Sequence, residues 1–485
     1  MPNQPLNIVL LMSDQWRWDT IFAPDHPCQT PNLQRLANQG VAFYRAFTCV
    51  PLCCPARGAL FTGLWPHQAG LTDNVQPGSF YPHGKLHPTR KTYLERLRDE
   101  AGYAVTYAGK WHMGLGTAAE RGIRADVSDG AAPGRRGENL PRPTLREGGL
   151  PPYYATLAGR GRDQHAIEAG MAHINALAQG DRPFCAVIST WGPHFAHTVP
   201  QRFADMYADA TPQGFMPDNY CLPFLEHNKP KMQSKPYWPC QNTLPLSSED
   251  WRKTVAHYWG FCTHLDEQYG RVLDQLDELG LAENTVLAFC ADHGEMLGAH
   301  GNFDKGPYFY KEIMHIPMIV RDPLGRKPAN AQGFVNLRDL LPTLISLADA
   351  ENVLRDDERA RSYWATDHDA TFYTYDAYQG RQFKLRGVRT ERWKYNWSPN
   401  DLCELYDLET DPGERVNRID DPAHAATQAA LHRRLVAWME SEGDELLHAQ
   451  HLLPVGSYVD GRGFHEQHDP GWSERDKAWF AQRVR

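Results

Sequence analysis

Largely apolar segments that each end at an acidic residue constrain the fold of this sequence more than any other feature. Leu6–Ser13 is such a segment and is followed by Asp14, and Val286–Ala291 is followed by Asp292. A strand that is buried on both faces of a parallel sheet has this continuous apolar pattern. The sequence therefore predicts a buried strand at each place, with an aspartate at its carboxyl end.

Helices with clear start and stop signals separate the predicted strands. The pair Thr30-Pro31 begins a helix that ends at Gly40, because Thr is a favourable N-cap, Pro fits the first turn and Gly ends helices. The other predicted elements are helices at 93–101 and 255–279 and strands at 103–108 and 184–190.

This alternation of strands and helices predicts an α/β fold with a doubly wound, mostly parallel sheet flanked by helices. Sheets of this kind bind their ligands in the crevice beyond the carboxyl ends of the strands. Polar and charged residues that follow the predicted strands should therefore meet at one edge of the sheet. They are Asp14, Lys110, His112, His194, Asp292 and His293.

A charged stretch at 351–361 predicts a boundary between two domains. Residues 1–360 are expected to form a catalytic domain, and residues 361–485 a smaller α+β domain in which a helix covers an antiparallel sheet. Residues 114–149 are rich in Gly, Pro, Arg and Ala without periodicity. They predict a long loop over the site, which is either a substrate lid or an insertion.

Composition excludes several classes of protein. The 485 residues carry a net charge of −9 and contain no basic run of the kind that follows a nucleic-acid backbone. The longest apolar run near the start, Ile8–Met12, is too short for a signal peptide or a membrane span. Ten scattered cysteines form neither a disulfide scaffold nor a zinc pattern. We therefore expect a cytoplasmic protein with reduced cysteines and neither nucleic acid nor membrane as a partner.

The segment Val50–Gly63 carries the densest chemical pattern, in which Cys53, Pro55 and Arg57 are spaced C-x-P-x-R before a helix-like run. Pro55 pre-sets the first helical turn, so Cys53 should lie at a helix N-terminus, where backbone N–H groups favour an anion. Arg57 adds a cation one turn further on. On its own the pattern is weak, because a cysteine beside a proline is more often structural.

Other motifs along the chain make the Cys53 pattern more specific. Together with the Cys53 segment they resemble the type I, formylglycine-dependent sulfatases of the alkaline phosphatase superfamily, with Ala56 where Ser is commoner. In that family the cysteine is oxidised to formylglycine by a separate enzyme, and the fold has a smaller C-terminal domain. The matching motifs are Ser13-Asp14-Gln15, Asp73-Asn74, Ala108-Gly109-Lys110-Trp111-His112, Pro193-His194, Ala291-Asp292-His293-Gly294-Glu295, Lys305 and the segment 405–412.

The resemblance implies one divalent cation, which neutralises charge on the sulfate oxygens. Its ligands would be Asp14, Gln15, Asp292 and His293 together with residue Cys53. The family more often has two Asp at the first pair and Asp-Asn at the second, so Gln15 and His293 are departures. Oxygen ligands favour Ca²⁺, which we expect, whereas the imidazole admits Mn²⁺ as the alternative.

The resemblance also implies the catalytic roles. The hydrate of formylglycine at Cys53 attacks sulfur, Arg57 and Lys110 hold the hydrate and the sulfate, and His112 is the base of the second step. His194 and Lys305 bind sulfate and protonate the leaving alcohol.

Two further residues are assigned to substrate binding with an alternative beside each. Asn74 contacts sulfate or the leaving group, or is an ordinary turn residue. His197 follows Pro193-His194, where the family often has a second Pro, and is either a substrate contact or a surface histidine.

The sequence thus predicts a sulfuric ester hydrolase that acts on a small sulfated sugar, aryl sulfate or alkyl sulfate. Its expected partner is a formylglycine-generating enzyme during maturation, and a homo-oligomer is left open. The first alternative is a phosphonate monoester or phosphodiester hydrolase of the same superfamily. Lys110 and His112 argue against it, because uncharged hydroxyl residues tend to stand there in those relatives. The second alternative is a non-catalytic protein that binds an anion or a sugar.

Overall fold

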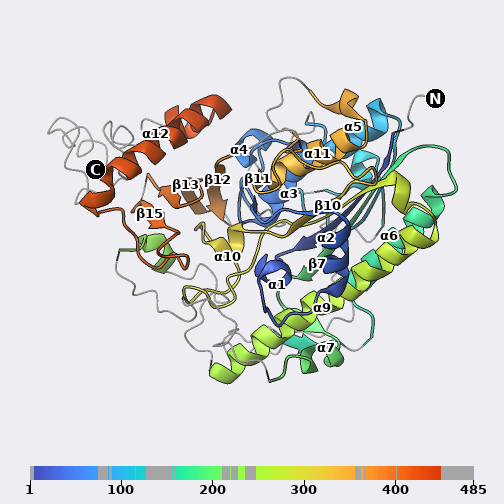
Figure 1. The fold of residues 1–485 in the computed structure, drawn as a ribbon, viewed down its shortest axis with the longest axis horizontal. Coiled ribbons are helices and arrows are strands. Elements are labelled where there is room, and N and C mark those ends of the chain that lie inside the picture. The colour runs from blue at the N-terminus through green and yellow to red at the C-terminus, as the bar shows by residue number, and fades with distance from the viewer. Residues whose placement is uncertain are drawn as a thin grey trace.

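The structure is a computed structural model in which two sheets organise the chain (Figure 1). Among its described helices, none combines the length and the hydrophobicity that a membrane span requires. The described residues are 5–74, 86, 90–114, 116–126, 154–157, 159–209, 219, 228–234, 247–355, 362–364, 368–378, 381–399 and 401–448.

The larger sheet has seven strands in the order β2-β10-β9-β1-β7-β4-β5. From β9 to β5 all neighbours run parallel, whereas β10 is antiparallel to both of its neighbours. The strand β1 lies in the middle of the sheet and is buried along its whole length. The strands are β1 (Asn7–Asp14), β2 (Val41–Ala42), β4 (Ala104–Gly109), β5 (Arg124–Asp126), β7 (Phe184–Pro193), β9 (Thr285–Ala291) and β10 (Met318–Arg321).

Helices pack on both faces of this sheet (Figure 1). On one face lie α2 (Pro31–Gln39), α6 (Arg162–Leu177) and the long α9 (Ser248–Glu278). On the other lie α3 (Cys53–Thr62), α5 (Tyr93–Glu100) and α11 (Leu340–Leu347). Shorter helices are α1 (Asp19–Phe22), α4 (Pro66–Ala69), α7 (Gln201–Asp205) and α10 (Lys311–Met314).

The smaller sheet is antiparallel and follows in the C-terminal part of the chain. Its strands are consecutive, and α12 (Ala425–Glu442) packs on it (Figure 1). The backbone N–H of Thr374 donates to the carbonyl of Cys49 at 2.9 Å, which ties this sheet to the segment before Cys53. The strands are β12 (Thr371–Tyr378), β13 (Arg381–Arg389), β14 (Trp393–Trp397) and β15 (Glu404–Asp407).

Two-stranded pairs and single turns of 3-10 helix complete the described chain. The pairs are β3 (Ala46–Phe47) with β11 (Val335–Asn336), and β6 (Tyr154–Thr156) with β8 (His197–Val199). The 3-10 turns lie at Ala119–Arg121, Lys231–Ser234, Ala282–Asn284, Leu337–Asp339, Glu351–Val353, Pro422–His424 and Glu445–His448.

The predicted fold class is confirmed, since a mostly parallel sheet flanked by helices is joined to an antiparallel sheet. The long helix begins at Ser248, seven residues before the predicted start, because Ser247 and Asp250 form a capping box there. The division at residue 360 stays a prediction. Of the loop predicted at 114–149, the described part contains a 3-10 turn and β5, while 115 and 127–149 lie outside the described residues.

Candidate active site

The ends of four neighbouring strands bring the predicted polar residues together. Asp14 ends β1, and Asp292 directly follows β9, whose last residue Ala291 is in register with Ser13. On the other side Asp14 is in register with Pro193, the last residue of β7. Lys110 follows β4, which is paired with β7. The edge that the sequence predicted is therefore the edge where these side chains meet.

The helix α3 presents Cys53 to this edge. It begins at Cys53, as predicted, and each of its residues is buried. The backbone N–H of Cys54 donates to Asn74 Oδ1 at 2.9 Å. The Asn74 amide thus accepts from one of the first-turn backbone N–H groups that have no acceptor within the helix. The part of Asn74 in substrate binding stays a prediction.

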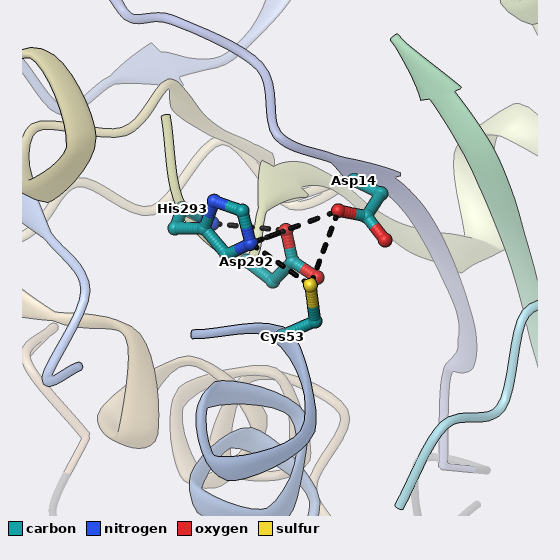
Figure 2. Close-up of side chains that lie close together, drawn as sticks. All are labelled: Asp14, Cys53, Asp292 and His293. Carbon is teal, nitrogen blue, oxygen red and sulfur yellow. Dashed lines mark hydrogen bonds and ion pairs between the residues drawn. The ribbon is translucent and has the colours of Figure 1, made fainter. Parts of the chain in front are cut away.

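Asp14, Cys53, Asp292 and His293 form one compact group, which we call the Cys53 cluster (Figure 2). Their donor atoms all lie within 4.8 Å of one another, and all four residues are buried. In Figure 2 the sulfur points from the start of its helix toward the carboxylates and the imidazole ring. The Cys53 Sγ atom lies 3.1 Å from His293 Nε2 and 3.6 Å from Asp14 Oδ1.

The tautomer of His293 is fixed by the backbone. Its Nδ1 atom lies 2.8 Å from the carbonyl oxygen of Gly294, which can accept but not donate. Nδ1 therefore carries the hydrogen, and Nε2 faces Asp14 Oδ1 at 3.7 Å and Asp292 Oδ1 at 3.8 Å. An imidazole that donates from one nitrogen to a carbonyl presents the other as a metal ligand.

The donor set fits a divalent cation. The carboxylates of Asp14 and Asp292, the Nε2 atom of His293 and the side chain of residue 53 converge from separate segments without contact with solvent. Gln15 is placed differently from the other predicted ligands. Its backbone N–H donates to Asp292 Oδ1 at 3.0 Å, while its side chain points to Lys305 and Glu295. A metal-binding role of the Gln15 amide stays a prediction.

Two buried cations balance the carboxylates of the cluster. The guanidinium of Arg57 donates from Nε to Asp292 Oδ2 at 2.8 Å, and its Nη2 atom lies 3.6 Å from Asp14 Oδ2. The Lys110 ammonium pairs with Asp14 Oδ2 directly. Arg57 also donates from Nη1 to the Lys110 carbonyl and to Ser189 Oγ, both at 2.8 Å, so its plane is held from two sides.

These charges set the protonation of the cluster. Burial alone would raise the pKa of the Cys53 thiol, but the cations, Lys110 first and then Lys305, hold that pKa well below its usual range. Burial opposes protonation of His293, yet the Asp292 carboxylate and the Cys53 thiolate raise its pKa to about 9. Burial and the thiolate favour the acid form of Asp14, but Lys110 and other cations lower its pKa to about 2. A bound cation displaces such protons from its ligands.

A second cationic group lies beside the cluster. Lys305 Nζ is 3.1 Å from His194 Nε2 and donates to Gln15 Oε1 at 2.8 Å. His194 Nδ1 lies 2.6 Å from the carbonyl of Phe195 and must donate to it, so Nε2 accepts from Lys305. The two residues that the sequence assigned to the leaving group are therefore in contact.

His112 reaches residue 53 from the segment after β4. A hydrogen bond between the two side chains, together with larger effects of burial and nearby cations, acts on the pKa of Cys53. The backbone of His112 has a φ of 46°, in the left-handed region that residues other than glycine adopt only uncommonly.

One interpretation of His197 is wrong. The sequence left it as either a surface histidine or a substrate contact, but its side chain is 0% exposed, so it is no surface residue. Its Nδ1 atom donates to the carbonyl of Pro193 at 3.0 Å, and Tyr258 and Phe303 pack against the ring. Burial lowers its pKa to about 3. Contact with a substrate stays a prediction.

Sequence reasoning missed three residues that support the site. Ser189 holds Arg57, and Asp304 accepts from Lys305 Nζ at 2.8 Å. Glu295 belongs to the motif after β9 but received no role. Its carboxylate contacts Gln15 Nε2 and the backbone N–H groups of Leu297 and Asp304. Residue order carried no signal for the contacts of Ser189 with Arg57 and of Glu295 with Gln15, because these join segments far apart in the chain.

The chain is similar to known sulfatases over most of its length. The family profile Sulfatase matches residues 6–350, and the profile described as N-sulphoglucosamine sulphohydrolase, C-terminal, matches residues 298–441. An ulvan-active sulfatase from Formosa agariphila is 26% identical over 95% of this chain and 86% of its own length. The uncharacterized sulfatase YidJ of Escherichia coli is 30% identical over 86% of this chain and 84% of its own length.

The fold is shared with solved structures as well. A phosphonate monoester hydrolase from Silicibacter pomeroyi superposes with a TM-score of 0.75 over 91% of this chain and 96% of its own, at 22% identity. At that identity the likeness concerns the fold. The matched family profile, by contrast, spans the Cys53 cluster and most of the chain. The chain therefore belongs to the sulfatase family, within the alkaline phosphatase superfamily.

Proposed function

We propose that this chain hydrolyses a sulfate monoester through a formylglycine made from Cys53, beside a divalent cation held by the Cys53 cluster and Gln15. Membership of the family supports hydrolysis of sulfate esters. One observation carries the finer proposal. Residue 53 lies at the start of a helix, in a buried group of two carboxylates and an imidazole, and is flanked by the cations Arg57 and Lys110.

Once formed from Cys53, the hydrate of formylglycine would supply a hydroxyl that attacks sulfur, and a bound cation would neutralise charge on the sulfate oxygens. Conversion of Cys53 replaces its sulfur by oxygen. All metal-binding atoms of the site except the Nε2 atom of His293 would then be oxygens. A set that is mostly oxygen favours Ca²⁺. The Nε2 atom of His293 leaves Mn²⁺ as the alternative.

Arg57 and Lys110 would hold the nucleophile and the sulfate in place. Because Arg57 is fixed by Asp292, Ser189 and a backbone carbonyl, its cation needs no reorganisation when negative charge develops. The Lys110 ammonium is paired with Asp14 and so stays charged near residue 53, since the Asp14 carboxylate opposes the loss of its proton.

Lys305 and His194 would act at the leaving oxygen. The hydrogen bond from Lys305 Nζ to His194 Nε2 gives the pair one shared proton path. Asp304 and other carboxylates raise the pKa of Lys305 well above its usual range although burial opposes this, so the ammonium form is the one present. His112 would take a proton at residue 53 in the half of the reaction that releases sulfate.

For the substrate we propose a small sulfated sugar, aryl sulfate or alkyl sulfate. The relative from Formosa agariphila is named for activity on ulvan, which supports the sugar class. The rival activity on phosphonate esters is disfavoured by the Lys110 ammonium and the His112 imidazole near residue 53, since the negative charge of a sulfate monoester is spread over three peripheral oxygens that such donors can reach.

A paired assay tests the proposal. Wild type, Cys53→Ala and Cys54→Ala are each assayed on nitrophenyl sulfate and on nitrophenyl phenylphosphonate. Cys54 is the matched control, because it is the neighbouring buried cysteine but its sulfur faces the Gly114 backbone N–H at 3.1 Å. We expect sulfate hydrolysis that is lost with Cys53→Ala and kept with Cys54→Ala. Preferred turnover of the phosphonate by wild type would contradict the proposed substrate class.

A further inference from the structure

The carboxylate of Glu295 joins two parts of the site that are distant in sequence. Its Oε1 atom accepts from the backbone N–H groups of Leu297 at 3.0 Å and Asp304 at 2.5 Å, and its Oε2 atom accepts from Gln15 Nε2. The side chain is fully buried. These three donors all favour the ionised form.

The chemistry of its neighbours fixes which way the Gln15 amide points. A carboxylate accepts hydrogen bonds, so the NH₂ group of Gln15 must face Glu295. An ammonium can only donate, so the amide oxygen must face Lys305. The Oε1 atom indeed lies 2.8 Å from Lys305 Nζ. Gln15 is therefore a polar link whose direction Glu295 sets.

Glu295 also fixes Lys305 through the backbone of Asp304. It accepts a hydrogen bond from the N–H of Asp304, the residue just before Lys305, and Asp304 itself has a left-handed φ of 68°. The Asp304 side chain returns to Lys305 Nζ at 2.8 Å. The ammonium is thus held by the Gln15 amide on one side and by the Asp304 carboxylate on the other.

We propose that Glu295 is a positioning residue for Lys305, which it holds at the leaving oxygen through the Gln15 amide and the Asp304 backbone. This inference rests on the proposed function, in which Lys305 protonates the leaving alcohol. It adds a role for a residue that does not touch the substrate. If Glu295 has this role, the loss of kcat in its variants should depend on how much the leaving group needs a proton. A merely structural contact would lower kcat equally for all leaving groups.

The first variant is Glu295→Gln. A glutamine whose oxygen keeps the backbone N–H groups must turn its NH₂ toward Gln15. Gln15 must then reverse its amide, which brings NH₂ instead of oxygen toward the Lys305 ammonium. We expect kcat on an alkyl or sugar sulfate, whose leaving oxygen needs a proton, to fall roughly tenfold to a hundredfold. On nitrophenyl sulfate, whose leaving group needs no proton, we expect a change of less than about threefold.

The second variant is designed to restore the contact between residues 15 and 295 with the amide and the carboxylate exchanged. In Gln15→Glu/Glu295→Gln the carboxylate at 15 can accept both from Lys305 and from the new amide at 295. We expect this pair to recover most of the activity on the alkyl sulfate. Glu404→Gln is the matched control, because Glu404 is a buried carboxylate that accepts from Gln233 and Asn396 in the smaller sheet. It should lower activity on both esters equally, if at all.

A readout independent of turnover separates this inference from the proposed function. Reductive methylation of Lys305, followed by peptide mass, reports how firmly the ammonium is held. We expect labelling to be faster in Glu295→Gln than in wild type, and slow again in the double variant. If Glu295→Gln does not fold, Glu295→Asp keeps the charge but shortens the side chain, so the carboxylate can reach the loop N–H groups or Gln15 but not both. It must give the same leaving-group dependence and faster labelling of Lys305.

Equal losses on both esters without recovery in the double variant would overturn the inference and leave Glu295 a structural residue. Unchanged labelling of Lys305 would overturn it as well. Absence of sulfate hydrolysis in wild type would instead overturn the proposed function, and the labelling would still decide whether Glu295 holds Lys305.

Discussion

The Nε2 atom of His293 lies 3.1 Å from the sulfur of Cys53, and the ring is oriented by the hydrogen bond that its Nδ1 atom donates to the backbone carbonyl of Gly294. The side chain at the helix start and the nitrogen donor after β9 therefore occupy one buried space with the carboxylates of Asp14 and Asp292. A nucleophile made at residue 53 would share its environment with the metal ligands. Changes at either residue should affect both.

The first prediction is that removal of the metal lowers activity. Treatment with a chelator should lower sulfate hydrolysis roughly a hundredfold or more, since a cation on the sulfate oxygens contributes several kcal/mol to the transition state. Titration with Ca²⁺ should restore the rate. Recovery with Mn²⁺ but not with Ca²⁺ would assign the site to a transition metal. In His293→Asn, which replaces nitrogen by oxygen, the affinity measured for Mn²⁺ should fall more than that for Ca²⁺.

His112→Ala tests the base of the second step. Loss of a general base typically costs about 10²–10⁴ in rate, and here it should fall on the step that releases sulfate. We expect a stopped-flow burst of nitrophenol from nitrophenyl sulfate, close to one per converted site, followed by slow turnover. The melting temperature should change little, because His112 is partly exposed. A slow reaction without a burst would place His112 in the first step instead.

Stability at low pH should depend on the buried His197. Burial lowers its pKa to about 3 from 6.5, so the unfolded state binds more protons between these values. The contribution of neutral His197 is therefore present above pH 6.5 and is lost as the pH falls. At pH 5 the loss is at most about 2 kcal/mol.

The measurement compares wild type with His197→Asn, which keeps a donor for the Pro193 carbonyl but does not titrate. The urea midpoints should differ most near pH 7.5 and converge toward pH 5. Other buried histidines are present in both proteins, so their titration cancels in the difference. A difference that stays constant with pH would mean that His197 is not held neutral in the folded state.

Arg57→Met should destabilise the protein strongly. The change leaves the carboxylates of Asp292 and Asp14 buried without their guanidinium partner, which typically costs about 3–5 kcal/mol. Arg434→Met is the control, since Arg434 pairs with Asp369 at an exposed site where such pairs contribute about 0–1 kcal/mol. Denaturant unfolding with chelator present checks both. Equal effects of the two variants would contradict the account of Arg57.

The sequence predicted the sheet edge because strand periodicity and strand ends are local properties. The apolar segments before Asp14 and Asp292 form neighbouring strands, and the C-x-P-x-R pattern places Cys53 at the first residue of α3. The strand β10 was not predicted. It has four residues and pairs antiparallel with β9, so its neighbours rather than its own length determine it.

Contacts between distant segments set the limit of sequence reasoning. The role of Gln15 depends on which side-chain partners face its amide, and both Glu295 and Lys305 lie far along the chain. The burial of His197 also depends on contacts between distant segments. The sequence left open whether this histidine is exposed, but tertiary packing by Tyr258 and Phe303 buries it completely.

The most direct test of the central claim is the mass of the peptide that contains residue 53, measured on protein co-expressed with a formylglycine-generating enzyme. We expect the mass at Cys53 to change to that of formylglycine while Cys54 stays a thiol, and sulfate ester hydrolysis to rise with the converted fraction. An unmodified Cys53 in protein that hydrolyses sulfate esters would show that formylglycine is not the nucleophile.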